Sequence, residues 1–249
     1  RADARLLEAR DLRRGREAPA PAGTAHVRQH ELMSDAAYPP EPWFLAGQML
    51  ISTFLVDPPD IPGLDTALPD GHRLVLVRGR AVVGVASVTY DARGMLEYDE
   101  LLVGVLTRTR GSLRVTIPQI WVSTEASAAG GRELWAIPKH VATFTPDGSI
   151  QVRLPDGAPV LRLAAHLGAR ILPRLPLTLT TAQRALTYPA GSAVGSTTSR
   201  NRVHADVRRV RVRWDVARSG PLAWLARRRP LLSLALSDAV ITFGRDVRR

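Results

Sequence analysis

The chain has 249 residues, of which 45% are hydrophobic, and this suits one large domain or two small ones with a sizeable core. It contains no cysteine, which excludes thiol catalysis, disulfides and cysteine-ligated zinc. The net charge of +11 lies near the end: residues 170–249 carry 16 Arg against four Asp, whereas residues 1–169 carry 18 Lys or Arg against 19 Asp or Glu.

Residues 1–37 are charged and then rich in Pro and Ala, without a pattern of apolar positions. We expect them to be disordered or a non-native extension, with the natural start near Met33. Residues 38–249 are expected to form a single domain. No apolar run reaches the length of about 18 residues that a membrane span needs. No secretory signal is recognised either, so the sequence predicts a soluble, cytoplasmic protein with no membrane partner.

From Trp43 onward, short apolar runs between turn signals favour β-strands. We expect strands at Phe44–Val56, His72–Val77, Ala81–Tyr90, Leu96–Thr107, Ser112–Thr124, His140–Phe144, Ser149–Leu154, Pro159–His166, Leu175–Thr180, Arg184–Thr187, Val203–Trp214 and Ser233–Phe243. Short helices are expected at Ala126–Leu134, which Pro138 ends, and at Pro221–Ala226. This pattern predicts a mainly β fold: a closed antiparallel barrel or cone with a central pocket and a few short peripheral helices.

The arginines of the last third could indicate a nucleic-acid partner. In Val203–Trp214, however, the Arg residues partly alternate with Val, as on the exposed face of a strand. Few aromatic residues lie between them, and no recognised nucleic-acid motif accompanies them. We therefore expect no nucleic-acid partner.

Lys139 is the only lysine among the 34 Lys and Arg residues. Average composition would predict roughly fifteen lysines in a chain of this length. Arginine cannot give up its proton and act as an amine nucleophile, whereas lysine can. Lys139 is therefore a candidate for a reaction that needs an amine, the alternative being that one lysine survived by chance.

The segment Gly131–Lys139, GRELWAIPK, resembles the acetoacetate decarboxylase family, whose pattern is G-R-E followed by mostly apolar residues and P-K. The acidic strand segment Glu97–Leu102 is similar to the family's strand that bears a catalytic acid. Weaker matches follow at Val203–Trp214, at residues 220–222 and at Phe243-Gly244. The resemblance extends from about Tyr38 to Gly244.

The resemblance implies that Lys139 forms a Schiff base with a small keto acid and that Glu100 is the catalytic acid. Burial in an apolar pocket disfavours the ammonium form and lowers the pKa of a lysine, which is the family's known means of activation. The iminium then acts as an electron sink, so a β-keto acid such as acetoacetate can lose CO2. Such a reaction needs no metal and no organic cofactor. The family and the exposed strand edges also favour a homo-oligomer.

Two positions depart from the family pattern. His140 replaces a second lysine, and Gln48 stands where the family has an arginine that contacts the substrate carboxylate. We expect Gln48 to bind substrate more weakly than an arginine, because it cannot form a charge-assisted bidentate contact. Two alternatives stay open: an aldolase-dehydratase that condenses pyruvate with aldehydes through the same lysine, and a binding module without catalytic activity.

Overall fold

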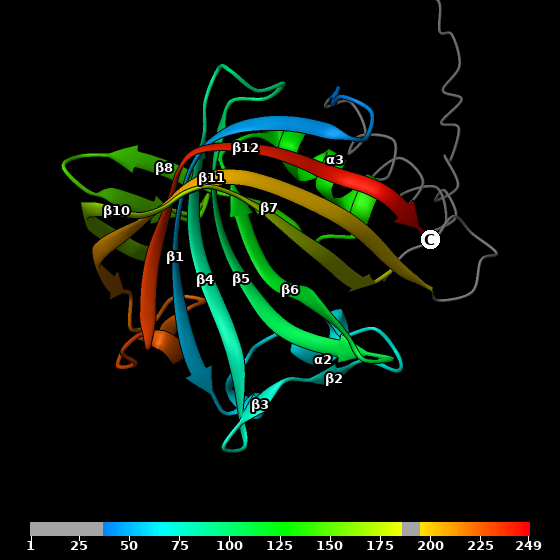
Figure 1. Ribbon diagram of the computed structural model, residues 1–249. Coiled ribbons are helices and arrows are strands. Elements are labelled where there is room, and N and C mark those ends of the chain that lie inside the picture. Colours follow the sequence, from blue (N-terminus) through cyan, green and yellow to red (C-terminus); the bar gives the residue numbers. More distant parts are fainter. Residues whose placement is uncertain (1–36, 186–194) are drawn as a thin grey trace, which may run out of the picture. The chain divides into compact units, whose positions relative to one another are not determined.

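The computed structural model describes residues 37–185 and 195–249 (Figure 1). The predicted N-terminal extension lies outside these ranges, apart from residue 37, and so do residues 186 and 187 of the strand expected at Arg184–Thr187. No helix in the described part of the chain is long and apolar enough to cross a membrane.

The described residues form twelve strands and two short α-helices. The helices are α2 (Leu64–Ala67) and α3 (Glu125–Trp135), with single 3-10 turns η1 (Pro58–Asp60) and η2 (Ala223–Leu225). The strands are β1 (Trp43–Val56), β2 (Arg73–Leu74), β3 (Leu76–Val77), β4 (Arg80–Tyr90), β5 (Tyr98–Thr109), β6 (Ser112–Val122), β7 (Lys139–Val141), β8 (Thr143–Pro146), β9 (Ile150–Arg153), β10 (Pro159–Arg184), β11 (Ser196–Val216) and β12 (Leu232–Arg248).

The strands form one sheet in the order β7-β6-β5-β4-β1-β12-β11-β10-β9-β8, and β6 also pairs with β10, which closes the sheet into a ring. The prediction of a mainly β, closed sheet with few helices is confirmed. Most pairings are antiparallel, but β6 pairs in parallel with both β7 and β10. The β6–β7 pair is parallel because α3 is a crossover connection: it returns the chain to the end of the sheet at which β6 began.

Several expected strand boundaries are wrong. The segments expected as single strands at His72–Val77 and His140–Phe144 are each divided, into β2 and β3 and into β7 and β8. Strands were predicted separately at Pro159–His166 and Leu175–Thr180, but both belong to the 26-residue strand β10. Gly168 and Pro173 lie between the two predicted strands. The structure accommodates these residues through three register shifts against β11, in a stretch where β10 pairs with β11 alone. Irregularities and a free neighbouring edge are the places where a strand tolerates proline.

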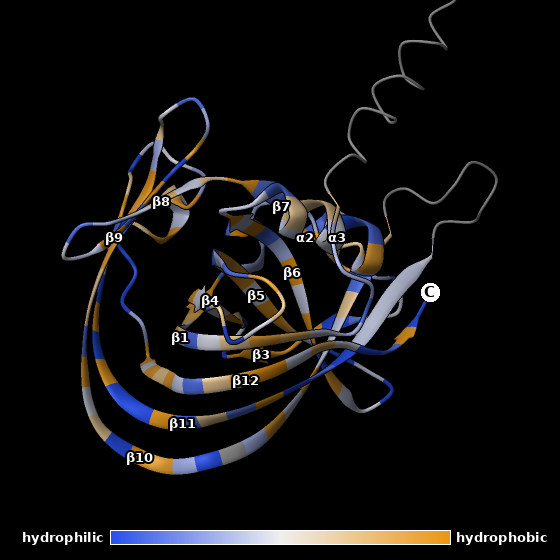
Figure 2. Cartoon of the chain, turned by 90° about the horizontal axis from the view of Figure 1, so that it is seen from above, coloured by the Kyte–Doolittle hydropathy of each residue, from blue (hydrophilic) through white to orange (hydrophobic). Residues whose placement is uncertain are grey.

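The sheet has a hydrophobic core on each face. Val83 and Leu101 belong to one core, together with Leu163 near the start of β10. Val88 belongs to the other, together with Ile241 of β12. β11 and β12 contribute residues to both cores. Figure 2 shows that β10, β11 and β12 curve from the side of β8 and β9 around to the side of α3.

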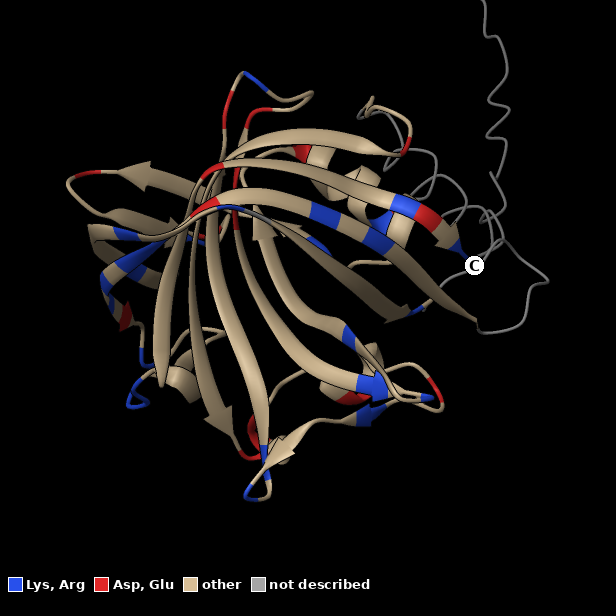
Figure 3. Ribbon diagram, in the orientation of Figure 1, with Lys and Arg blue, Asp and Glu red and all other residues tan. Residues whose placement is uncertain are grey.

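Charged residues avoid the middle of the sheet. Figure 3 shows β1, β4 and β5 mostly free of charge, with Lys and Arg gathered on loops, strand ends and the outer strands. On β11, exposed Arg209, Arg211 and Arg213 alternate with half-buried Val210 and Val212. This confirms the alternation expected from the sequence.

A glutamine completes the ring where the backbone pairing is sparse. Between β6 and β10 the register gives one residue pair, Thr181 with Val115. Buried Gln183 extends it: the N–H of Ile117 donates to Gln183 Oε1 at 2.7 Å, and Gln183 Nε2 donates to the carbonyl of Ile117 at 2.8 Å. The side-chain amide thus replaces a backbone partner. Thr116 Oγ1 adds a bond to the carbonyl of Ala182 at 3.0 Å.

We expect Gln183→Ala to lower the free energy of unfolding by about 2–4 kcal/mol, because it leaves a buried N–H and a buried carbonyl without partners. Urea unfolding followed by circular dichroism measures this change. Gln48→Ala is the matched control, since Gln48 is exposed and should change stability by no more than about 0.5 kcal/mol. Equal effects of the two variants would contradict this role of Gln183.

Candidate active site

Lys139 is the first residue of β7 and is placed by the helix before it. Helix α3 begins after Thr124, whose side chain accepts a hydrogen bond from the N–H of Ser127, and it ends at Trp135, before Ala136 in the left-handed conformation. This confirms the expected helix to within one residue at each end. Lys139 then pairs with Ile120 of β6, which carries its side chain to the inside of the sheet.

The amine of Lys139 lies in a buried polar cluster. Its Nζ is 2.8 Å from Glu100 Oε2 and 3.0 Å from Ser127 Oγ. Lys139 and Glu100 are each only 4% exposed. The amine also lies 5.2 Å from the ring centroid of Tyr98 and 5.8 Å from that of Trp43. The structure therefore brings together the two residues that the sequence singled out as catalytic.

The alternation of β5 decides which acidic residue reaches the amine. Tyr98 and Glu100 lie on one face and are buried. Asp99 lies on the other, where Thr89 Oγ1 donates to its carboxylate at 2.8 Å. Glu97 is exposed before the strand begins. Glu100 is thus the carboxylate of this segment that contacts Lys139.

Helix α3 contributes two residues that the sequence analysis missed. Ser127 and Gly131 are four residues apart and so share a helix face, a spacing that could have revealed them. Ser127 accepts a hydrogen bond from the amine. A Cβ on Gly131 would lie 2.4 Å from Cδ and 2.7 Å from Cε of Lys139, so the lysine stem can cross the helix only because residue 131 is glycine.

The neighbouring residues of the GRE segment hold the backbone in place. Arg132 donates from Nη1 to the carbonyl of Lys139 at 2.9 Å. Glu133 accepts a hydrogen bond from the hydroxyl of Tyr38. These contacts give Arg132 and Glu133 a structural role, since they hold the segment that presents Lys139.

Two tyrosines stand beside the amine and carboxylate. The rings of Tyr90 and Tyr98 are 4.5 Å apart between centroids, and both are buried. Burial, and next the negative charge of Glu100, raise the pKa of each phenol well above its usual range. Both therefore keep their protons at neutral pH and can donate hydrogen bonds in the site.

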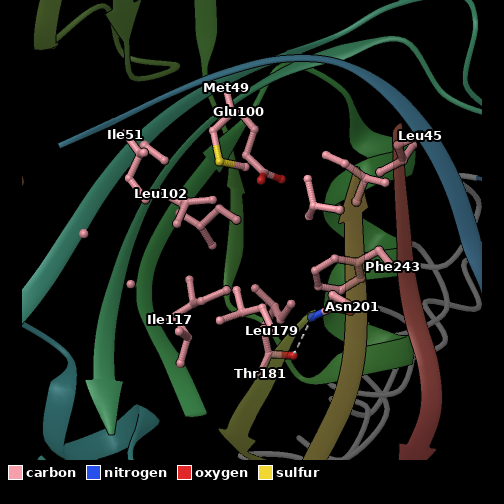
Figure 4. Close-up of a pocket in the computed structure, with 18 of the residues that line it drawn as sticks. Leu45, Met49, Ile51, Glu100, Leu102, Ile117, Leu179, Thr181, Asn201 and Phe243 are labelled. Atoms are coloured by element: carbon pink, nitrogen blue, oxygen red, sulfur yellow. Dashed lines mark hydrogen bonds between the residues drawn. The ribbon is translucent and has the colours of Figure 1, made fainter. Parts of the chain in front are cut away.

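These residues line a cavity of about 290 Å³ (Figure 4). Its wall is mostly aliphatic and aromatic. Figure 4 shows Glu100 and Met49 toward one end, Ile117 and Thr181 toward the other, and Leu102 between them. Lys139 is the only cation among the described residues that line the cavity.

A second polar cluster, also missed by the sequence analysis, forms part of the wall between β10, β11 and β12. Asn201 Oδ1 accepts a hydrogen bond from the N–H of Gly244 at 2.9 Å, and Asn201 Nδ2 donates to Thr181 Oγ1 at 3.4 Å (Figure 4). The hydroxyls of Thr181 and Ser199 are 2.7 Å apart. This network joins the three strands and places one amide at the edge of the cavity.

The structure corrects the position inferred for Gln48. It is exposed and does not line the cavity; Met49, the next residue along β1, does. The register between β1 and β12 shifts between Gly47 and Met49, and this irregularity is where simple alternation from the sequence fails. His140, the other departure from the family pattern, is exposed, as expected if neighbours on a strand point to opposite faces.

No group of three or more His, Asp or Glu side chains that could hold a metal ion occurs among the residues that the structure describes. The chemistry that this arrangement supports comes from an amine, a carboxylate, a serine hydroxyl and two phenols. Together they can form a carbonyl adduct on nitrogen and move protons around it.

Comparison with known proteins relates the chain to a family of enzymes. The family model described as acetoacetate decarboxylase matches residues 29–180. No curated protein matches the chain. Among solved structures, an acetoacetate decarboxylase from Legionella pneumophila is 17% identical with a TM-score of 0.57, covering 84% of this chain and 87% of its own.

Two further solved structures share the fold. The enduracididine biosynthesis enzyme MppR complexed with pyruvate is 15% identical with a TM-score of 0.58, covering 86% of this chain and 92% of its own. An acetoacetate decarboxylase-like enzyme from Sphingomonas wittichii RW1 is 17% identical with a TM-score of 0.53, with the same coverage of 86% and 92%.

The raised pKa values of Tyr90 and Tyr98 predict a loss of stability in alkali. Each phenol keeps its proton in the folded state above the ordinary pKa of 10.0 but loses it in the unfolded state. The free energy of unfolding should therefore be unaffected below about pH 10 and fall above it, by up to about 1.4 kcal/mol per pH unit for each tyrosine. Urea unfolding between pH 8 and about pH 11 measures this slope.

Tyr90→Phe is expected to make that slope shallower. Tyr38→Phe should do so as well, because burial and the bond to Glu133 raise the pKa of Tyr38 to about 12. A slope in Tyr90→Phe as steep as in the parent would contradict the buried, protonated phenol.

Proposed function

The chain belongs to the acetoacetate decarboxylase family, and from this we propose that it is a lyase in which Lys139 forms a Schiff base with the ketone of a β-keto acid and releases CO2. The single observation that carries the proposal is the buried contact of Lys139 Nζ with Glu100 and Ser127, at 2.8 and 3.0 Å, on the wall of a cavity.

The reaction begins with loss of a proton from the ammonium of Lys139. Glu100 is the acceptor within hydrogen-bond distance. Proton transfer turns the buried ion pair into a neutral acid and a neutral amine, whose lone pair can attack a carbonyl. The amine then attacks the ketone carbon and forms a carbinolamine. Glu100 returns the proton to the departing hydroxyl, which leaves as water.

The iminium that remains drives the loss of CO2. The bond between the α carbon and the carboxylate breaks, and its electrons move through the new double bond onto nitrogen, giving an enamine. Glu100 became a carboxylate when water left, so before CO2 departs it takes up a proton from solvent. It then passes this proton to the enamine carbon. Water then hydrolyses the iminium, which releases the ketone and restores the amine.

The neighbours of Lys139 support these steps. The hydroxyl of Ser127 accepts a hydrogen bond from the amine and so fixes the orientation of the amine. The lone pair on nitrogen stays available once the ammonium has lost its proton. The rings of Trp43 and Tyr98 lie near enough to stabilise the positive iminium through their π faces. Tyr90 and Tyr98 keep their protons and can hydrogen-bond the developing alkoxide of the carbinolamine.

The same lysine would support a second reaction, aldol condensation and dehydration of pyruvate with an aldehyde. MppR, which shares the fold, has been solved with the condensation product of pyruvate and imidazole 4-carboxaldehyde. The size of the cavity favours this candidate, because 290 Å³ leaves room for a second reactant beside a small keto acid. That the chain forms a homo-oligomer, and that it acts in the cytoplasm, stay predictions.

The sole lysine makes the central test unambiguous. We expect incubation with acetoacetate and borohydride to add one reduced adduct per chain at Lys139, located by intact mass and peptide mapping. Lys139→Arg keeps the positive charge opposite Glu100 but has no nucleophilic amine, so it should give no adduct at the site. Release of CO2 from the unreduced reaction selects decarboxylation, and enone formation from pyruvate and an aldehyde selects the aldolase. An unmodified Lys139 with every keto acid would contradict both and favour a binding module.

Gly131→Ala tests the path of the lysine stem. The added methyl would overlap Cδ and Cε of Lys139, so we expect the amine to leave Glu100 and the trapping rate to fall by at least about tenfold, a loss typical of a misplaced catalytic group. Alanine is the better helix former by about 1 kcal/mol, so helix α3 itself should not be weakened. A trapping rate equal to that of the parent would show that the stem can cross the helix another way.

A further inference from the structure

The cavity extends well beyond the polar residues around Lys139. Glu100, Leu102, Gly104 and Leu106 alternate along β5, and all four line it. Six residues of strand span about 20 Å. The pocket is therefore a channel along the inner face of the sheet, with the Lys139–Glu100 pair at one end.

Small residues form the floor of this channel. Gly84 of β4 pairs directly with Gly104 of β5, and Ala86 pairs with Leu102. All of them line the cavity. A Cβ on Gly84 would make only ordinary contacts, the nearest being Ile51 Cδ1 at 3.6 Å, so nothing in the packing of the sheet requires a glycine there. What the glycine leaves free is space in the channel.

The walls of the channel are apolar away from the lysine. β1 supplies Met49 and Ile51, and β6 supplies Val115 and Ile117. Among the described lining residues, the charged ones are Lys139 and Glu100, which satisfy each other. A small, polar keto acid bound at Lys139 would leave most of this wall uncovered.

The end far from Lys139 is the more open one. Leu179 lines the cavity and is 43% exposed, whereas Lys139 is 4% exposed. Leu106 and Val115 near that end are half-buried. A linear molecule with a ketone at the deep end would therefore run its other end toward Leu179.

We infer that the substrate of this site carries an unbranched hydrocarbon chain, which makes it a β-keto acid several carbons longer than acetoacetate. This inference rests on the proposed function for the reaction at Lys139. The ketone lies at the amine, and the chain lies over Ala86, Gly84 and Gly104 toward Leu179. The carboxylate needs no second cation, because the iminium is its counter-charge until CO2 departs.

A chain-length series tests the inference. Steady-state kcat/KM is measured for CO2 release from acetoacetate, β-oxohexanoate, β-oxooctanoate and β-oxodecanoate. Each methylene buried in the channel should raise kcat/KM by about fourfold until the channel is full. Values that stay flat or fall with length would overturn the inference while leaving the proposed function intact.

A substitution in the channel floor gives an independent readout. Gly84→Leu places an isobutyl group between the lysine and the open end, and should lower kcat/KM for β-oxodecanoate at least tenfold more than for acetoacetate. Gln48→Leu adds a leucine on the exposed side of β1 and should leave that ratio unchanged. A ratio that Gly84→Leu does not change would contradict the proposed path of the chain.

A probe that cannot react distinguishes failure of the proposed reaction from failure of the proposed channel. If no keto acid of any length forms an adduct on Lys139, the proposed function is wrong, and titration with decanol by calorimetry decides the channel. Saturable binding by the parent that weakens in Gly84→Leu but not in Gln48→Leu supports a hydrocarbon-binding channel. Absence of binding by the parent would overturn it.

Discussion

The buried contact between Lys139 and Glu100 is the constraint on which the rest of the site depends. Desolvating an ammonium and a carboxylate is costly, and the attraction between them offsets this only if the geometry is good and the remaining hydrogen-bonding groups are satisfied. Here the 2.8 Å contact, the hydroxyl of Ser127 and two aromatic rings provide that environment. Replacing one partner by an apolar residue would leave the other as an uncompensated buried charge.

Three elements must converge to make this contact, and the topology explains how they do so. β5 contributes Glu100, α3 contributes Ser127 and β7 contributes Lys139. β6 lies beside both β5 and β7, and α3 is the crossover that makes β7 parallel to β6. Gly131 allows the lysine stem to pass the helix, and Arg132 holds the lysine carbonyl. The residues before Lys139 therefore position its amine in the cavity.

The sequence predicted the parts of the site that lie in recognisable segments. Glu100 was inferred from the resemblance of Glu97–Leu102 to the acidic strand of the family, and Lys139 is the sole lysine and ends the GRELWAIPK segment. Gln48 could not be placed, because the irregularity in β1 beside it breaks the alternation. β10 contains a glycine and prolines, which usually mark breaks in a strand, and only its pairing with β11 shows that the strand continues through them. Ser127 was missed because its spacing from Gly131 shows only that the two share a helix face, whereas the neighbour of that face depends on how α3 is docked.

The absence of arginine from the described wall of the cavity gives the proposed reaction a consequence for selectivity. The chain has 34 Lys and Arg residues, yet Lys139 alone among those that the structure describes lines this cavity, and at rest its charge is balanced by Glu100. A substrate carboxylate therefore gains a counter-charge of its own only once Glu100 holds a proton and nitrogen has become an iminium. Binding energy that appears only after the covalent step favours the reactive state over the ground state, and so contributes to catalysis rather than to uniform binding. Initial recognition is then left to the apolar channel.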